Sequence, residues 1–199
     1  INEKLIVNKN TRYKHKYFPQ TKEELQDSIK QLIEERGNDG DFNDIDTSKI
    51  TDMSKLFYKM EDFNGDISQW NVSNVTSMYE TFYNCKSFNQ SLNDWDVSNV
   101  TDMEHMFCGC KSFNKPLNDW DVSNVTNMKG MFCRCYLFNQ PLNDWDVSNV
   151  INMANMFFYC EKFNKRLNYW NVTKVENMYA MFKYCTSFNQ PLNSWDVSN

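Results

Sequence analysis

The stretch LNDWDVSNVT at residues 92–101 decides the fold of this chain, because the sequence writes it several times. It returns unchanged at 117–126, and again at 142–151 with only its last residue altered. A period of roughly 20–50 residues is typical of solenoids and other repeat arrays. The phrase therefore marks a building unit, and its six tryptophans recur every 25 residues, at Trp70, Trp95, Trp120, Trp145, Trp170 and Trp195.

The repeat organises most of the 199 residues. Residues 1–40 form an N-terminal segment, and residues 41–199 form the array. A seventh unit breaks off at Asn199. The six full units begin at Phe42, Ile67, Leu92, Leu117, Leu142 and Leu167.

One unit contains two apolar patterns. In the phrase, Trp95 and Val97 alternate with aspartates, as the two faces of a short strand do. The following apolar residues have the i, i+3, i+4, i+7 spacing of a short amphipathic helix: Met103, Met106, Phe107 and Cys110. The sequence therefore predicts an α/β solenoid, a leucine-rich-repeat-like stack with one short parallel strand and one short helix per unit.

The segment before the array predicts a cap for its first unit. Thr21 and Glu24 have the spacing of a capping box, and Gly37 suits a helix C-terminus. We expect a helix over about 21–36 that covers the open end of the stack, as terminal caps of repeat arrays do.

The repeated residues also carry a family resemblance. Leu92, Trp95 and Val97 resemble the leucine-rich-repeat pattern L-x-x-L-x-L. The longer pattern FNQPLNDWDVSNVTNMxxMFxxC, over residues 41–199, is similar to the repeat of BspA-like leucine-rich-repeat surface proteins, including their mycoplasma lipoprotein-type branch. The resemblance implies a curved solenoid used for adhesion or protein binding, commonly at a cell surface, and it implies no catalytic residues.

Composition narrows the partners that can be expected. A net charge of -5 gives no indication of nucleic-acid binding, which would favour a basic face. No apolar run approaches the roughly 18 residues of a membrane helix, so we expect no membrane insertion by these residues. The serines beside the aspartates recur in nearly every unit, which indicates a structural ladder rather than a nucleophile. We therefore expect neither an enzyme nor a cofactor.

Seven cysteines require two explanations. Five keep the 25-residue step and complete the apolar pattern, so they are predicted to be small buried residues. Cys108 and Cys133 are additional, and with His105 they leave a zinc cluster open as an alternative. Neighbouring helices about 8–10 Å apart would not allow a ladder of disulfides. Unpaired thiols suit an intracellular protein, whereas the resemblance favours a cell-surface or secreted one.

Two kinds of polar column follow from the stack. The asparagines that follow the repeated phenylalanine are predicted to form an amide ladder for backbone groups. The aspartates form two columns, which would repel one another about 4.8 Å apart. Either one column accepts hydrogen bonds from its own turns, or both face a basic partner or a cation. In the second case millimolar calcium should stabilise the protein. The columns are Asp94, Asp119 and Asp144, and Asp96, Asp121 and Asp146.

The expected function is a non-enzymatic scaffold that recognises a protein partner through its strand face. The sixth unit departs from the acidic pattern there, with Tyr169 and Asn171 in place of the aspartates and Arg166 nearby, and these three residues join the six aspartates as candidate binding residues. We expect no metal site. End-to-end self-association through an uncapped last repeat is a further expectation. The alternative is a structural spacer or coat element without a specific ligand.

Overall fold

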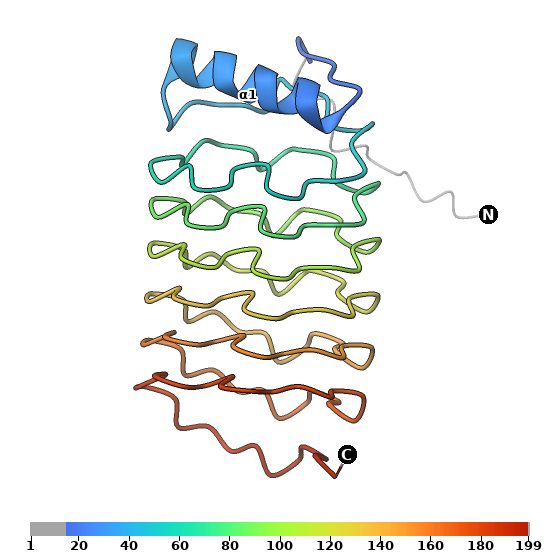
Figure 1. Ribbon diagram of the computed structural model, residues 1–199, viewed down its shortest axis with the longest axis vertical. Helices are drawn as coiled ribbons and strands as arrows, with labels where there is room; N and C mark the ends of the chain where they lie inside the picture. Colours follow the sequence, from blue (N-terminus) through green and yellow to red (C-terminus); the bar gives the residue numbers. More distant parts are fainter. Residues whose placement is uncertain (1–14, 199) are drawn as a thin grey trace, which may run out of the picture.

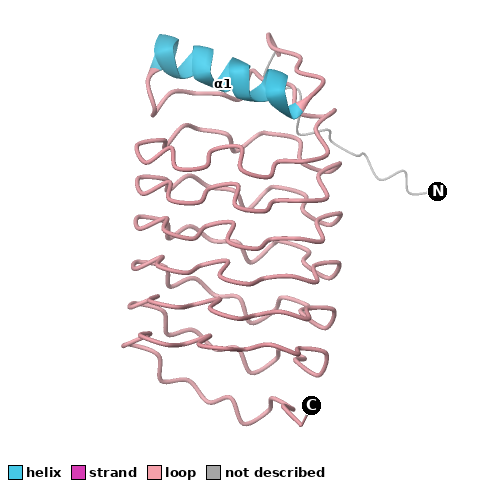
Figure 2. Ribbon diagram, viewed as in Figure 1, coloured by secondary structure: helices cyan, strands magenta, loops and turns pink. Residues whose placement is uncertain are grey.

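The computed structural model describes residues 15–198 and shows a stack of coils, one for each 25-residue unit (Figure 1). Within these residues the only helix is α1, Lys22–Arg36, and the coils consist of turns and isolated bridges (Figure 2). The first fourteen residues of the predicted N-terminal segment, and Asn199, at which the seventh unit breaks off, lie outside the described part of the chain.

Helix α1 lies across one end of the stack, where the sequence predicts a cap (Figure 1). The Thr21 side chain accepts the Glu24 backbone N–H at 3.2 Å, as an N-cap does. At the other end, Gly37 has a φ of 75°, and its N–H donates to the Ile33 carbonyl. The helix buries Leu25, Ile29 and Leu32 against the first coil.

Neighbouring coils pair in parallel and in register. One column of bridges joins each coil to the next at equivalent positions, one unit apart, and two further parallel bridges, Tyr17 to Ile45 and Asp41 to Asp66, lie at the first coil. The bridged residue of each unit comes directly after the repeated ten-residue segment, as Asp102 follows residues 92–101, and does not lie within it. The members of the column are Asp52, Ser77, Asp102, Asn127, Asn152 and Asn177.

Residues 103–110, for which the sequence predicts a helix, form consecutive tight turns. Within the coil, the Met106 N–H donates to the Met103 carbonyl and the Cys108 N–H to His105. Alternate residues instead donate to the next coil: Met103 to Asn127, His105 to Lys129, Phe107 to Met131 and Gly109 to Cys133, at 2.7–2.9 Å. These N–H groups point along the stack axis, so they cannot bond four residues back as a helix requires.

Hydrogen bonds to the next coil account for the left-handed backbone in these turns. Two residues of each unit have a positive φ, and ten of the twelve are not glycine. A non-glycine residue in this conformation costs about 1–2 kcal/mol. In five of the six units both such N–H groups donate to the next coil, as from His105 to Lys129 at 2.8 Å, and this bond offsets part of the cost.

The predicted strand at Trp95–Val97 also differs from the structure. A turn precedes it, with the Trp95 N–H bonded to Leu92, and another follows it, with Val100 bonded to Val97. The short extended piece between them makes no bridge to its neighbours. Its alternation still holds, since Trp95 and Val97 are buried and Asp94 and Asp96 are exposed.

The core is a set of aromatic columns that run through the stack. Phe107 stacks on Phe82 at 5.4 Å and on Phe132 at 5.7 Å between ring centroids, with the rings nearly parallel. A second column contains Phe88, Phe113 and Phe138 at about 6.0 Å spacing. Each phenylalanine therefore buries its faces against the adjacent units, and a single unit has no complete core of its own.

Candidate functional site

The repeated tryptophan performs the same structural task in every unit. Its side chain points inward, and its indole Nε1–H donates to a carbonyl 28 residues earlier, at 2.8–3.1 Å in all six copies. Trp120, for example, donates to Leu92. A buried indole N–H needs a partner, and here the preceding coil provides it.

Asparagines join the coils at two further places. After each repeated phenylalanine, the amide oxygen of one asparagine accepts the backbone N–H of its equivalent in the next unit, as Asn89 accepts that of Asn114 at 3.0 Å. In the phrase, the Asn99 side chain donates to the Ser73 carbonyl at 2.7 Å, and its equivalents do the same. The predicted amide ladder is present, and it satisfies backbone groups of the neighbouring coil.

The five cysteines of the core column are also bonded. Each thiol donates to a carbonyl 28 residues earlier at 2.8–3.0 Å, as Cys110 does to Phe82. Burial raises the pKa of these thiols well above the usual range, as for Cys110 and Cys135. All seven cysteines are free and buried. The argument against disulfides assumed neighbouring helices about 8–10 Å apart, but the coils are instead joined by in-register backbone hydrogen bonds. The hydrogen bonds from the thiols to carbonyl groups explain why each unit has a cysteine at this position.

The second aspartate column caps its own turns. Asp96, Asp121 and Asp146 each accept the N–H of the serine two residues later, at 3.0–3.2 Å. The bonds from the Ser148 side chain and backbone lower the pKa of Asp146. In the second and sixth units Asn71 and Asn171 make the same bond. This geometry agrees with the turn interpretation and not with a column of unpaired carboxylates.

In the first aspartate column, Asp119 forms hydrogen bonds with the side chains of nearby asparagines. Asp119 accepts hydrogen bonds from the side-chain amides of Asn93, at 2.5 Å, and Asn118, at 2.8 Å. The Asn93 oxygen accepts the Asp119 N–H in return. Asp94 and Asp144 occupy the equivalent exposed positions. An amide between successive carboxylates moderates the repulsion expected from their spacing.

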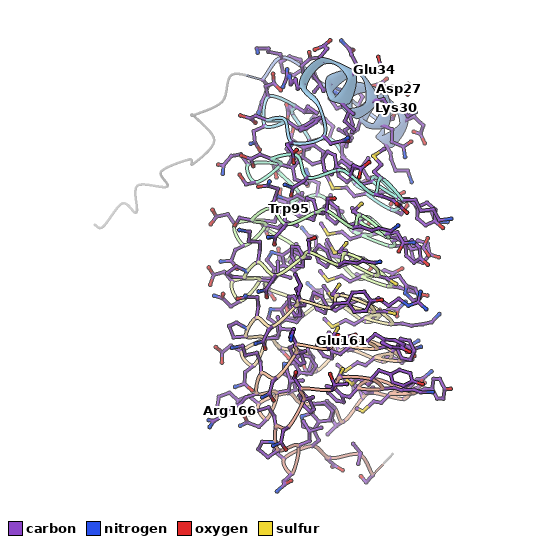
Figure 3. The ribbon with its side chains drawn as sticks, turned by 90° about the vertical axis from the view of Figure 1, so that its left-hand side faces the viewer. Asp27, Lys30, Glu34, Trp95, Glu161 and Arg166 are labelled. Atoms are coloured by element: carbon purple, nitrogen blue, oxygen red, sulfur yellow. The ribbon has the colours of Figure 1, made fainter. Side chains whose placement is uncertain are left out.

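The sixth unit breaks this acidic pattern at its surface. Tyr169 is 73% exposed and replaces the aspartate of the earlier units. It borders a shallow depression of about 350 Å³. Arg166 is exposed at the edge of the molecule in the view of Figure 3. The depression is lined by Asn143, Asp144, Trp145, Asp146, Val147, Tyr169 and Asn171.

Cys108 and Cys133 are both buried at equivalent positions of adjacent units, and the neighbouring Cys133 thiol, together with burial, raises the pKa of Cys108. His105 lies over Gly130, where a Cβ would meet its ring at 2.3 Å. Its Nδ1 is buried without a hydrogen-bond partner. Among residues 15–198 no three His, Cys, Asp or Glu side chains are placed to hold a metal ion. The zinc alternative thus has no set of ligands in this part of the chain.

Sequence reasoning missed a second surface, formed by the tight turns, whose side chains vary from unit to unit instead of repeating. We call it the turn face, and it consists of the residues of the tight turns that lie outside the core cluster; five of them, at 108, 109, 130, 133 and 154, are nevertheless buried. Aromatic and charged side chains vary there from unit to unit, a variation that an alignment of the units could have revealed. The turn face comprises residues 54, 55, 58 and 59, together with their equivalents at 79, 80, 83 and 84; 104, 105, 108 and 109; 129, 130, 133 and 134; 154, 155, 158 and 159; and 179, 180, 183 and 184.

These features define a tandem-repeat protein whose fixed residues bond each unit to the next. The chain belongs to the family described as "Mycoplasma protein of unknown function, DUF285", whose matches at residues 25–132 and 115–199 together span the array. Comparisons with curated proteins and with solved structures gave no match. No helix in residues 15–198 is long and apolar enough to cross a membrane.

Proposed function

We propose that this chain is a non-enzymatic repeat scaffold for protein recognition or adhesion. One observation carries the proposal: the side chains that bond one unit to the next are repeated, whereas the outward side chains of the tight turns differ from unit to unit. The tryptophan, asparagine and turn-capping aspartate of each phrase all have structural partners. The residues left for a ligand are therefore those that change between units.

The finer assignment extends the same proposal. We infer a leucine-rich-repeat-like solenoid in which tight turns take the place of the helix, within the BspA-like group of repeat proteins. A cell-surface or secreted location follows from that resemblance. The buried, hydrogen-bonded thiols of the core column are compatible with such a location, because they are shielded from oxidants there.

The side of the stack formed by residues 92–101 and their equivalents, which we call the phrase side, offers one place for recognition, beside Tyr169. Tyrosine and arginine are enriched among residues that anchor protein interfaces. Exposed Tyr169, Asn171 and the carboxylates of Asp144 and Asp146 border one shallow depression, and exposed Arg166 adds a cation three residues before Tyr169 in the chain. A protein partner with both apolar and charged side chains suits this mixture.

The test replaces the departing residues with those of the preceding unit. Arg166→Pro with Tyr169→Asp reproduces Pro141 and Asp144, so the coil keeps side chains that it already accommodates. We expect the parent chain to bind cell-surface proteins saturably and the double variant to bind them at least about tenfold more weakly. Unchanged binding by the variant would show that the partner docks elsewhere.

The alternative is a spacer or coat element that supplies only length and rigidity. The near identity of the phrase from the third to the fifth unit favours it. An absence of saturable binding by the parent chain would support the spacer. Self-association through the last coil is a separate proposal, which sedimentation of the 199-residue chain over a range of concentrations tests.

A further inference from the structure

The turn face has a charge opposite to that of the chain. It carries five cations, Lys55, Lys59, Lys129, Arg134 and Lys183, against two carboxylates, Glu80 and Glu104, while the chain carries -5. The side chains of both carboxylates are largely covered, at 13% and 20% exposure. What the face presents to solvent is therefore positive.

Aromatic rings accompany these cations. Six of the ten tyrosines of the chain belong to the turn face. Tyr58 and Tyr83 stack at 5.1 Å near one end, and Tyr159 and Tyr184 stack at 4.3 Å near the other. Tyr179 is 72% exposed beside the second pair. Rings that already stack lose little further side-chain freedom when a partner covers them.

The two cations of the first unit are held over tyrosine rings of the first and second units. The Lys59 ammonium lies 5.0 Å from the Tyr58 ring centre. Lys55 lies 5.5 Å from Tyr58 and 5.4 Å from Tyr79, and its ammonium is 3.5 Å from the Glu80 carboxylate. Within the described residues no carboxylate forms an ion pair with Lys59. We call this group the Lys–Tyr cluster, and it consists of Lys55, Lys59, Tyr58, Tyr79 and Tyr83.

A second cluster lies four units further along the stack. The Lys183 ammonium is 5.2 Å from the Tyr184 ring centre, next to the Tyr159 stack. Arg134 is exposed between the two clusters. In-register units lie about 4.8 Å apart, so the turn face extends for about 24 Å. An extended polypeptide covers that length with about seven residues.

We propose that the turn face binds an extended acidic segment of a partner protein, with the Lys–Tyr cluster as one anchor and the Tyr159–Tyr184 pair as the other. Carboxylates of the partner pair with the ammonium and guanidinium groups, and its apolar side chains pack on the tyrosine rings. The proposal rests on the proposed recognition function and names the partner chemistry for a surface distinct from the Tyr169 depression.

The probe is a fluorescent peptide of about ten residues in which Glu alternates with Tyr, and the control peptide has Gln in place of each Glu. The full chain should bind the acidic peptide at least about tenfold more tightly than the Gln peptide, and added salt should weaken the binding. Lys55→Gln with Lys59→Gln should weaken it about tenfold. Lys165→Gln with Lys174→Gln removes the same charge on either side of Tyr169, away from the turn face, and should leave the affinity within about twofold.

Three results would overturn the proposal. The first is that the acidic peptide does not bind the parent chain. The second is that both lysine double variants weaken peptide binding equally, which indicates attraction by net charge alone. The third is that a sulfated polysaccharide competes with the peptide and binds more tightly. Thermal unfolding of both variants verifies that they keep the parent fold. Saturable binding of surface proteins that persists while the peptide fails would leave the recognition function standing and remove only this surface.

Discussion

The phrase side and the turn face both join one coil to the next, but they use different atoms. On the phrase side, Trp120 bonds to the previous coil through its indole, and Asn99 bonds through its amide. On the turn face, His105 and Gly109 bond to the next coil through their backbone N–H groups. A side-chain bond requires a particular residue, whereas a backbone bond accepts almost any. The difference explains why one side is repeated and the other varies.

The largest effect that can test this contrast is loss of a tryptophan. Trp120→Ala should cost about 3–5 kcal/mol of unfolding free energy, because a buried ring is deleted and the Leu92 carbonyl loses its donor. Trp195→Ala is the matched control: its indole makes the same bond to Leu167, but the ring is only partly buried in this chain. We expect a clearly smaller loss in urea denaturation. Equal losses would contradict the view that burial between two coils stabilises each unit.

A smaller loss is expected at the amide ladder. Asn114 accepts the Asn139 N–H at 2.9 Å and the Gln140 side-chain amide, also at 2.9 Å. Asn114→Ala leaves these donors unpaired and should cost about 1–3 kcal/mol. Arg134→Asn on the turn face keeps a residue that tolerates a φ of 60°. It should change stability by less than about 0.5 kcal/mol. Guanidinium titrations of both variants make the comparison, which fails if the turn-face change is the more costly one.

The aspartate columns give a third, still smaller effect. Asp121→Ala should cost about 1 kcal/mol, because the Ser123 N–H loses its acceptor, whereas Asp121→Asn should be nearly neutral. Asn71 and Asn171 already fill this role in two units. Thermal denaturation with and without millimolar calcium separates this interpretation from a cation-binding stripe. If calcium stabilises the parent chain but not the Asn variant, the carboxylates serve a ligand as well as a turn.

The smallest effect concerns pH and falls on the turn face. Burial lowers the pKa of His105; the Glu104 and Glu80 carboxylates oppose this shift without reversing it, and the Lys129 cation adds to it. The unfolded chain therefore binds a proton more readily below about pH 6.5. Stability should fall as the pH drops from 7 towards 5, as measured by urea midpoints.

His105→Asn is the control for this pH effect, since Asn155 occupies the equivalent position with a φ of 57°. The variant should lose part of the pH slope between 7 and 5. Carboxylates with lowered pKa values, such as Asp44 and Asp52, lose their contribution only in a more acid range, below about pH 4. An unchanged slope in the variant would exclude His105 as its cause.

Much of the core could be predicted from the sequence, because a period of 25 residues places the same side chains above one another. The capping signals at Thr21 and Gly37 predict a helix that agrees with α1 to within one residue. The secondary structure of the units could not be predicted in this way. In the tight turns one or two inward residues alternate with two outward ones, a period of four. Over eight residues, as from Met103 to Cys110, this is hardly distinguishable from the period of 3.6 that marks a helix.

The candidate site was harder to predict for a related reason. The aspartates stand out in the sequence because they are repeated, yet repetition follows from structural work such as the Asp96 turn bond. Positive φ values, which would have revealed the turns, are usually signalled by glycine. Only Gly109 and Gly130 give that signal in the turns, while lysine, arginine, glutamate, asparagine, histidine, tyrosine and alanine occupy the other ten positions.

The amide ladder also governs how such a gene can change in length. Asn64 accepts the Asn89 N–H in the same way as Asn89 accepts that of Asn114. Deletion of residues 65–89, one repeat length, would make Asn64 the acceptor of the Asn114 N–H, so the ladder would keep its donor–acceptor pairing. Unequal recombination between copies can therefore lengthen or shorten the protein by whole units, and each product inherits interfaces that are already complete.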